Sequence, residues 1–205
     1  AGLAVLMQAA PAAAIEVPPR PDPTELARLA DGQSQRSNWQ PPGMTERYGH
    51  AEVLVHAPIA TVHRAVQNYG RYKELVPSKF NNAHVVAKEG DATDVYMQVP
   101  IMHGLLTLWQ VMRFRDLGPL APGWAMVEGW YLRGNLKAGN VAWTLHAVDP
   151  EFTVLKVDLL ILPNVPAPQG MIDEELRDAA AQAVEGIRDQ TQAAPGPVPY
   201  AGGKP

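Results

Sequence analysis

The sequence contains no cysteine and little serine, and each shortage excludes a kind of chemistry. Without cysteine there is no disulfide bond, no thiolate metal ligand and no cysteine nucleophile. Serine occurs only at Ser34, Ser37 and Ser78, and the Gly-x-Ser-x-Gly motif of serine hydrolases is missing. The six histidines form neither a His-Glu-x-x-His nor a His-x-His motif. We therefore expect no metal site and no cofactor, and no catalytic residues stand out.

Basic residues are too few and too scattered for a nucleic-acid-binding protein. Lys and Arg number 17 against 21 Asp and Glu, which gives a formal net charge of −4. Affinity for phosphate depends on clustered Lys and Arg, so we expect no nucleic-acid partner. Hydrophobic residues make up 46% of the 205 residues, which is enough to bury the core of one domain of ordinary size.

The first residues resemble the end of a secretory signal peptide. An apolar stretch is followed by small residues, Ala12 to Ala14, that a signal peptidase would accept. The stretch is shorter than the ~20 residues that a transmembrane helix needs, and Pro11 interrupts it. A low-complexity, alanine-rich tail is the alternative interpretation. We interpret residues 1–14 as a signal-peptide remnant and expect an exported protein, either periplasmic or secreted.

Proline marks the limits of the domain. Residues 15–44 are proline-rich and predict a stiff linker. Within this linker, Thr24 and Gly32 are the expected N-cap and stop signal of a short helix. Residues 193–205 are rich in proline and glycine and predict a flexible tail. The packed domain is therefore expected over residues 45–192.

Hydrophobic periodicity in this domain predicts a strand, a short helix, six further strands and a long helix. Apolar residues alternate along the predicted strands, as half-buried antiparallel strands require. The last helix carries an apolar, alanine-rich stripe at i, i+4, i+7 spacing. A curved antiparallel sheet of about seven strands around one long helix is an α+β fold, and a cavity remains because one helix does not fill the concave face. The predicted strands cover residues 46–56, 83–88, 93–101, 105–116, 124–134, 140–148 and 152–162, and the predicted helices cover 59–69 and 169–190.

Four stretches of this domain follow one another in a specific order. They are residues 50–62 (strand, proline, helix), residues 69–77, Gly134-Asn135 leading to Trp143-Thr144-Leu145, and residues 162–166 just before the long helix. In this order they resemble the START-like (SRPBCC) helix-grip superfamily, which includes polyketide cyclases, coenzyme Q-binding proteins and lipid-transfer domains. The resemblance covers about residues 46–192, although Asp149-Pro150-Glu151 lacks the glycine-rich turn often found before the last strand. It implies a hydrophobic ligand held between the sheet and the C-terminal helix.

Charged residues inside two apolar strands allow two interpretations. Arg113 and Arg115 lie in one strand and Glu128 lies in the next. In the first interpretation they form a cross-strand ion pair on the outer face of the sheet. In the second, Arg113 points into the cavity and orients the polar end of an apolar ligand. Similarity to sterol-carrying START domains implies comparable places for Gln98 and Arg113, with the acidic partner missing or replaced by Asp94 or Glu128.

Because side chains alternate along a strand, the direction of Arg113 also determines which of its neighbours line the cavity. If Arg113 faces inward, Trp109 does so too; if not, the cavity is lined by Leu106, Leu108, Gln110, Met112 and Phe114. Hydrophobicity favours the second arrangement, and the sequence leaves both open. The candidate ligand-binding residues therefore come from both faces and include aromatic and methionine side chains suited to a bulky apolar ligand. They are Tyr96, Met97, Gln98, Trp109, Met112, Arg113, Glu128, Trp130 and Trp143.

The function predicted from these features is that of an exported lipid-binding or lipid-transfer protein. Its ligand would be a sterol, hopanoid, quinone or acyl lipid, bound by transfer of apolar area from water, with transient membrane contact. One alternative is a polyketide cyclase or aromatase-like enzyme, in which Arg113 and Tyr96 polarise a carbonyl group. Another is a protein-interaction module with a collapsed pocket. No paired carboxylates or His–carboxylate set stands out, and we therefore prefer the carrier interpretation over an enzyme.

Overall fold

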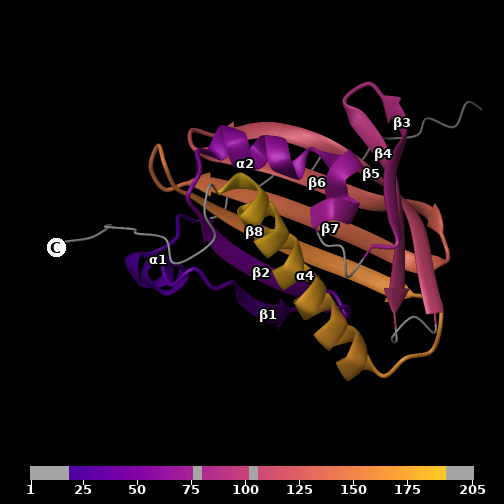
Figure 1. Cartoon of the computed structure of the whole chain (residues 1–205). Coiled ribbons are helices and arrows are strands. Elements are labelled where there is room, and N and C mark those ends of the chain that lie inside the picture. The colour runs from indigo at the N-terminus through magenta and orange to yellow at the C-terminus, as the bar shows by residue number, and fades with distance from the viewer. Residues whose placement is uncertain (1–18, 76–79, 102–105, 193–205) are drawn as a thin grey trace, which may run out of the picture.

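An eight-stranded antiparallel sheet curves around one long helix (Figure 1). The computed structural model describes residues 19–75, 80–101 and 106–192. The strand order is β1-β2-β8-β7-β6-β5-β4-β3, so the N-terminal strands join the rest of the sheet where β2 pairs with β8. The strands are β1 (Gln35–Trp39), β2 (Tyr48–Val55), β3 (Asn82–Glu89), β4 (Ala92–Ile101), β5 (Leu106–Ala121), β6 (Trp124–Gly134), β7 (Leu136–Ala147) and β8 (Thr153–Pro163). The helices are α1 (Pro23–Leu29), α2 (Ile59–Val66), the 3-10 turn η1 (Tyr69–Arg71), α3 (Tyr72–Leu75) and α4 (Gln169–Thr191).

This architecture confirms the predicted α+β helix-grip fold. Seven of the strands lie where apolar alternation predicts them, and α4 begins at the predicted residue. The additional strand, β1, lies within residues 15–44, where the sequence predicts a linker. The predicted signal-peptide remnant (1–14) and flexible tail (193–205) lie outside the described residues. Among the residues that are described, no helix is both long and apolar enough to cross a membrane.

The short strand β1 is held by partners that lie far away in the sequence. Its backbone pairs with β2, and its side chains reach α4 on the concave side of the sheet. Arg36 forms an ion pair with Asp178, and the Asn38 amide donates a hydrogen bond to the backbone carbonyl of Asp173 at 2.8 Å. Because its polar side chains find their partners only in the folded protein, β1 has no local signal in the sequence.

Helix α1 is also part of the packed structure. Its N-cap is Asp22 and not the predicted Thr24: the Asp22 carboxylate accepts a hydrogen bond from the Glu25 backbone N–H at 2.8 Å. Pro23 then occupies the first helical position, where its missing N–H costs nothing. At the other end of α1, Leu29 is completely buried against the outer face of β2 and β8.

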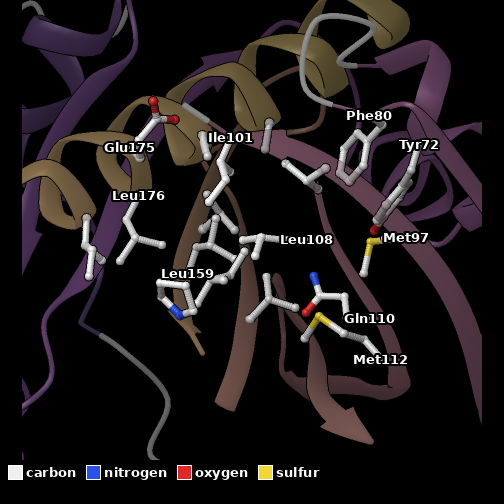
Figure 2. Close-up of a pocket in the computed structure, with 18 of the residues that line it drawn as sticks. Tyr72, Phe80, Met97, Ile101, Leu108, Gln110, Met112, Leu159, Glu175 and Leu176 are labelled. Carbon is white, nitrogen blue, oxygen red and sulfur yellow. The ribbon is translucent and has the colours of Figure 1, made fainter. Parts of the chain in front are cut away.

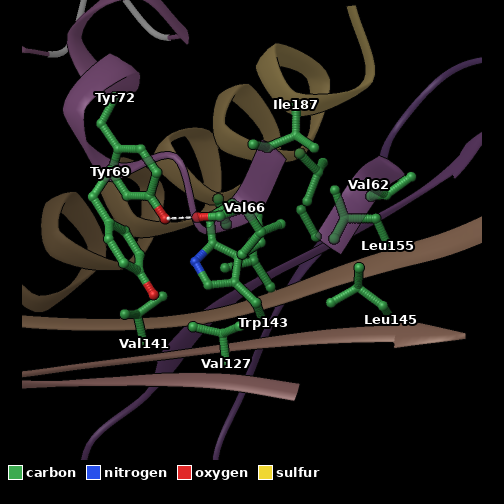
Figure 3. Packing of buried hydrophobic residues seen from close by; sticks show 14 of the residues in the cluster. Val62, Val66, Tyr69, Tyr72, Val127, Val141, Trp143, Leu145, Leu155 and Ile187 are labelled. Atoms are coloured by element: carbon green, nitrogen blue, oxygen red, sulfur yellow. Dashed lines mark hydrogen bonds between the residues drawn. The ribbon is translucent and has the colours of Figure 1, made fainter. Parts of the chain in front are cut away.

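The hydrophobic core fills only one end of the space between the sheet and α4. There Val62 and Val66 of α2 and Ile187 of α4 pack against Trp143 and Leu145 of the sheet (Figure 3). All five side chains are nearly or completely buried. Toward the N-terminus of α4, the described helices add only the Tyr72 side chain of α3 to this layer, and the concave face of the sheet remains partly uncovered.

Candidate ligand-binding cavity

A cavity of about 400 Å³ occupies the uncovered end of the concave face (Figure 2). Strands β4, β5, β7 and β8 form its floor, and the N-terminal half of α4 covers it. Tyr72 of α3 and Phe80 close one side, and residues 163–167, which lead into α4, contribute another. The volume lies toward the lower end of the range of small-molecule sites in proteins.

Strand β5 supplies four inward-facing side chains, Leu108, Gln110, Met112 and Phe114. This confirms the arrangement that hydrophobicity favours, with Arg113 on the opposite face; the Leu106 side chain lies outside the described part of the structure. The physical reason is that one face of β5 must be apolar to pack against α4 and the core, and strand alternation then places its charged residues outside.

Helix α4 contributes small side chains to the roof of the cavity. Ala179 and Ala183 lie between the bulkier Leu176 and the core, and Met171 and Ile172 extend the apolar lining toward the helix N-terminus. Larger residues at the two alanine positions would occupy part of the cavity. The alanine-rich stripe seen in the sequence therefore leaves space for a ligand.

Few polar groups reach the cavity. The Tyr72 hydroxyl donates a hydrogen bond to the Val66 carbonyl at 2.7 Å, and burial raises the pKa of Tyr72 well above its usual value. Trp143 Nε1 lies beside this hydroxyl and makes no hydrogen bond of normal geometry (Figure 3). Glu175 of α4 lines the cavity from an exposed position. No lysine, arginine or histidine is among the described lining residues, and the described residues contain no cluster of three metal-ligating side chains.

Gln110 is a deeply buried polar side chain of the cavity wall. Only 4% of the residue is exposed, and its Oε1 atom has no hydrogen-bond donor. Its cross-strand neighbours are Met97 on β4 and Gly134 on β6. On β7, a Cβ atom at Gly139 would lie 3.3 Å from Gln110 Oε1, so the β7 backbone packs closely against the amide at this glycine.

Comparison with known proteins identifies this architecture. The sequence matches no known family model and no curated protein. A solved fragment (25–204) of a STAR-related lipid transfer protein from Xanthomonas axonopodis aligns with a TM-score of 0.65 at 13% identity, over 77% of this chain and 92% of that one. Human StAR-related lipid transfer protein 5 aligns with a TM-score of 0.64 at 10% identity, over 78% of this chain and 82% of that one. The chain has the START-like helix-grip fold.

The START-like fold is also found in a protein with a different role. The di-domain aromatase/cyclase StfQ, from the steffimycin biosynthetic pathway, aligns with a TM-score of 0.51 at 16% identity, over 69% of this chain and 44% of that one. At such low identities the comparisons establish the fold alone. The chemistry of this START-like cavity must therefore be argued from its own residues.

The nine residues predicted from the sequence fall on both faces of the START-like sheet. Met97, Met112 and Trp143 line the cavity, and their contact with a ligand stays a prediction. The other six are not part of the cavity wall, because strand alternation directs their side chains to the outer face. They are Tyr96, Gln98, Trp109, Arg113, Glu128 and Trp130.

On that outer face, Arg113 forms a cross-strand ion pair, as in the first interpretation, but its partner is Asp94 on β4 and not Glu128 on β6. Its Nε and Nη2 atoms donate to the two carboxylate oxygens of Asp94, directly opposite on β4, at 2.7 and 2.9 Å. The hydrogen bond from Arg113 holds the pKa of Asp94 below its usual value. Glu89 accepts a further contact from Arg113 at 2.7 Å, and the Arg115 guanidinium lies over the Trp130 ring.

Sequence analysis left several lining residues out of the candidate list. Gln110 could have been selected with Met112, because both lie on the more apolar face of β5. Tyr72 and Phe80 lie outside the sheet, and Glu175 lies on the helix. The apolar pattern carries no signal that these three residues reach the cavity.

Proposed function

We propose that this chain is an exported lipid-binding or lipid-transfer protein that holds one hydrophobic small molecule in its START-like cavity. The observation that carries this proposal is the cavity of about 400 Å³, whose lining is almost entirely apolar. Water in such a space gains few hydrogen bonds, whereas an apolar ligand gains roughly 25 cal/mol for each Å² removed from water. A sterol, hopanoid, quinone or acyl lipid is the proposed ligand.

The described residues give less support to the two alternatives. A cyclase or aromatase needs acids or bases placed against its substrate. The titratable side chains that line the described cavity are Tyr72, whose hydroxyl donates a hydrogen bond to a backbone carbonyl, and Glu175, which lies on the opposite side of the cavity from Tyr72 (Figure 2). Arg113 and Tyr96, considered above for carbonyl polarisation, lie outside the cavity wall. A collapsed pocket does not agree with an open volume of this size.

Export is the part of the proposal that rests on sequence alone. The signal-like pattern in residues 1–14 supports it. In an aqueous compartment, a protein that encloses an apolar molecule lowers the cost of moving it between membranes. Transient contact with membranes, for loading and release, is therefore part of the same proposal.

A cavity-filling variant with a matched control tests ligand binding. Ala179→Leu adds three carbon atoms to the roof of the cavity, and Ala142→Leu makes the same change on the outer face of β7, between the inward-facing Val141 and Trp143. Purified proteins are incubated with phosphatidylcholine vesicles that contain cholesterol, ubiquinone and hexadecan-1-ol, separated by flotation and extracted. We expect the wild type and Ala142→Leu to acquire about one lipid molecule each and Ala179→Leu to lose most of it. Equal loading of all three proteins, or of none, would contradict the proposal.

A further inference from the structure

The methionines that the structure describes differ sharply in their access to solvent. Met44 is 38% exposed and Met171 is 44% exposed, whereas Met97 and Met112 are only 4% and 2% exposed. Met126 is partly buried and, like Met44, lies outside the cavity lining. Among these described methionines, Met171 is therefore the one that is both exposed to solvent and part of the cavity wall.

Met171 lies on the rim of the cavity because its side chain borders the cavity on one side and water on the other. It belongs to the first turn of α4, where its backbone N–H donates a hydrogen bond to the Pro168 carbonyl at 3.0 Å. Its neighbour Ile172 and the preceding residues Val165 and Ala167 also line the cavity. The backbone of this turn thus holds an unbranched thioether side chain at the edge of an apolar space.

An exposed thioether reacts with peroxides. The sulfur attacks one oxygen of hydrogen peroxide, the O–O bond breaks, and the products are a sulfoxide and one molecule of water; the sulfur loses two electrons and the peroxide gains them. The reaction converts a flexible apolar side chain into a polar one, and sulfoxide reductases reverse it. Because susceptibility follows exposure, Met171 should react well before Met97 and Met112, the two buried methionines of the same cavity wall.

We propose that Met171 is an oxidation site on the cavity rim and that a peroxide lowers the affinity of the cavity for its lipid by converting this residue to the sulfoxide. In the reduced protein, the thioether packs against the apolar ligand. After oxidation, a ligand that covers the sulfoxide oxygen removes it from water and gives it no hydrogen-bond donor, which is unfavourable. For the same reason, a bound ligand shields the sulfur and slows its oxidation. This inference rests on the proposed function, because it concerns the occupancy of the same cavity.

Oxidation rates of single methionines test the site itself. Lipid-free protein is treated with hydrogen peroxide, digested with trypsin at successive times and analysed by mass spectrometry. Met44 and Met171 are each the single methionine of a tryptic peptide, 37–47 and 157–177, and Met97 and Met112 are separated by fragmentation of peptide 89–113. We expect Met171 to react at about the rate of Met44 and roughly tenfold faster than Met97 or Met112. Loading with hexadecan-1-ol should slow the reaction of Met171 several-fold and leave that of Met44 unchanged; an unchanged rate at Met171 in the loaded protein would contradict the inference.

Binding measurements with matched variants test the consequence of the oxidation. Hexadecan-1-ol, cholesterol and ubiquinone are loaded from methyl-β-cyclodextrin before and after peroxide treatment, and Kd is obtained from the bound radiolabel. We expect peroxide to raise Kd by about five- to tenfold in wild type and in Met44→Leu, and to leave it unchanged in Met171→Leu, in which leucine conserves the volume but has no sulfur. Methionine sulfoxide reductases A and B with dithiothreitol should restore the affinity of wild type.

The outcomes separate this inference from the proposed function. If untreated wild type binds a probe but peroxide weakens Met171→Leu as much as wild type, the loss of affinity comes from other residues; the inference then fails and the proposed function stands. Peroxide-treated wild type that binds as tightly as untreated protein, with Met171 fully oxidised, contradicts the inference in the same way. If untreated wild type binds none of the three probes, the proposed function itself fails.

Discussion

The backbone of Leu176 on α4 lies directly against Gly49 of β2. A Cβ atom at position 49 would be 2.3 Å from both the carbonyl carbon and the carbonyl oxygen of Leu176. Real Cβ atoms do not approach backbone atoms so closely, so the contact requires glycine on the strand. It fixes α4 to the sheet beside the cavity, and the height of the cavity roof therefore depends on this contact.

Replacing Gly49 by alanine should push α4 away from the sheet. We expect Gly49→Ala to lower the free energy of unfolding by about 3 kcal/mol, as severe overpacking does. Gly170→Ala is the control, because a Cβ atom at Gly170 in the first turn of α4 meets nothing within 4 Å. Urea denaturation of both variants measures the difference. Equal stabilities would show that the contact does not restrain the helix.

Truncating Leu29 should destabilise the fold and leave ligand binding unchanged. Leu29 is completely buried in a small cluster between α1 and the outer face of the sheet, on the side opposite the cavity. Leu29→Ala should cost about 2–5 kcal/mol, while Leu132→Ala, at a residue that is 39% exposed, should cost much less. Urea denaturation measures the stabilities, and lipid retained after gel filtration measures binding. An unaltered stability of Leu29→Ala would show that residues 23–29 do not contribute to the packed structure.

Removing the Arg113 guanidinium should leave ligand binding unaffected. The side chain pairs with Asp94 on the outer face of the sheet, so Arg113→Leu leaves a mostly buried carboxylate without its counter-charge. We expect a loss of stability and an unaltered Kd for hexadecan-1-ol. Met112→Ala, one residue earlier and facing the cavity, should weaken binding of this probe. A large loss of affinity in Arg113→Leu, with none in Met112→Ala, would indicate that the Arg113 side chain contacts the ligand and would contradict its placement on the outer face.

The stability of the protein should fall as pH rises from about 6.5 to 9, because His50 loses its proton. Burial lowers the pKa of His50, but hydrogen bonds to Asp158 and Glu52 outweigh this effect and raise the pKa to about 9. Glu52 also contacts Lys156 at 2.8 Å. The charged groups on this part of β2 and β8 are therefore His50, Glu52, Lys156 and Asp158. A histidine whose folded-state pKa exceeds its unfolded-state value of about 6.5 stabilises the fold fully below pH 6.5, and this contribution is lost as pH rises through 9.

The comparison with a His50→Gln variant isolates this contribution. We expect wild type to lose at most about 3 kcal/mol relative to the variant between pH 6 and 9.5, since each unit of pKa shift corresponds to about 1.4 kcal/mol. Urea denaturation at several pH values gives the two curves. Parallel curves would show that the His50–Asp158 hydrogen bond does not favour the protonated ring.

The fold could be predicted from the sequence to the extent that its elements have a local pattern. Strand β8 shows clear alternation, and its predicted bounds, 152–162, differ from the observed ones by one residue at each end. Strand β1 has the sequence QRSNW. Its side chains are held by contacts with Asp173 and Asp178, on a helix that follows about 130 residues later in the chain. Tertiary contacts of this kind leave no pattern in a short segment.

The cavity wall was predictable only as two alternatives. Alternation relates Gln110 to Met112 and Trp109 to Arg113, but it does not say which pair faces the helix. That choice depends on the direction in which the whole sheet curves. The apolar face of β5 predicts the observed wall, whereas the resemblance to sterol-carrying domains implies a role for Arg113, which lies on the other face. Tyr72 enters the cavity from a short helix outside the sheet, so strand periodicity contains no information about it.

The most direct test of a ligand-binding cavity is native mass spectrometry of the protein purified without detergent, followed by solvent extraction. We predict one lipid-sized adduct per chain, which is lost on denaturation and recovered in the extract as a neutral, apolar molecule. A protein that is empty after purification, and that stays empty when sterols, quinones and long-chain alcohols are offered, would contradict the proposed function.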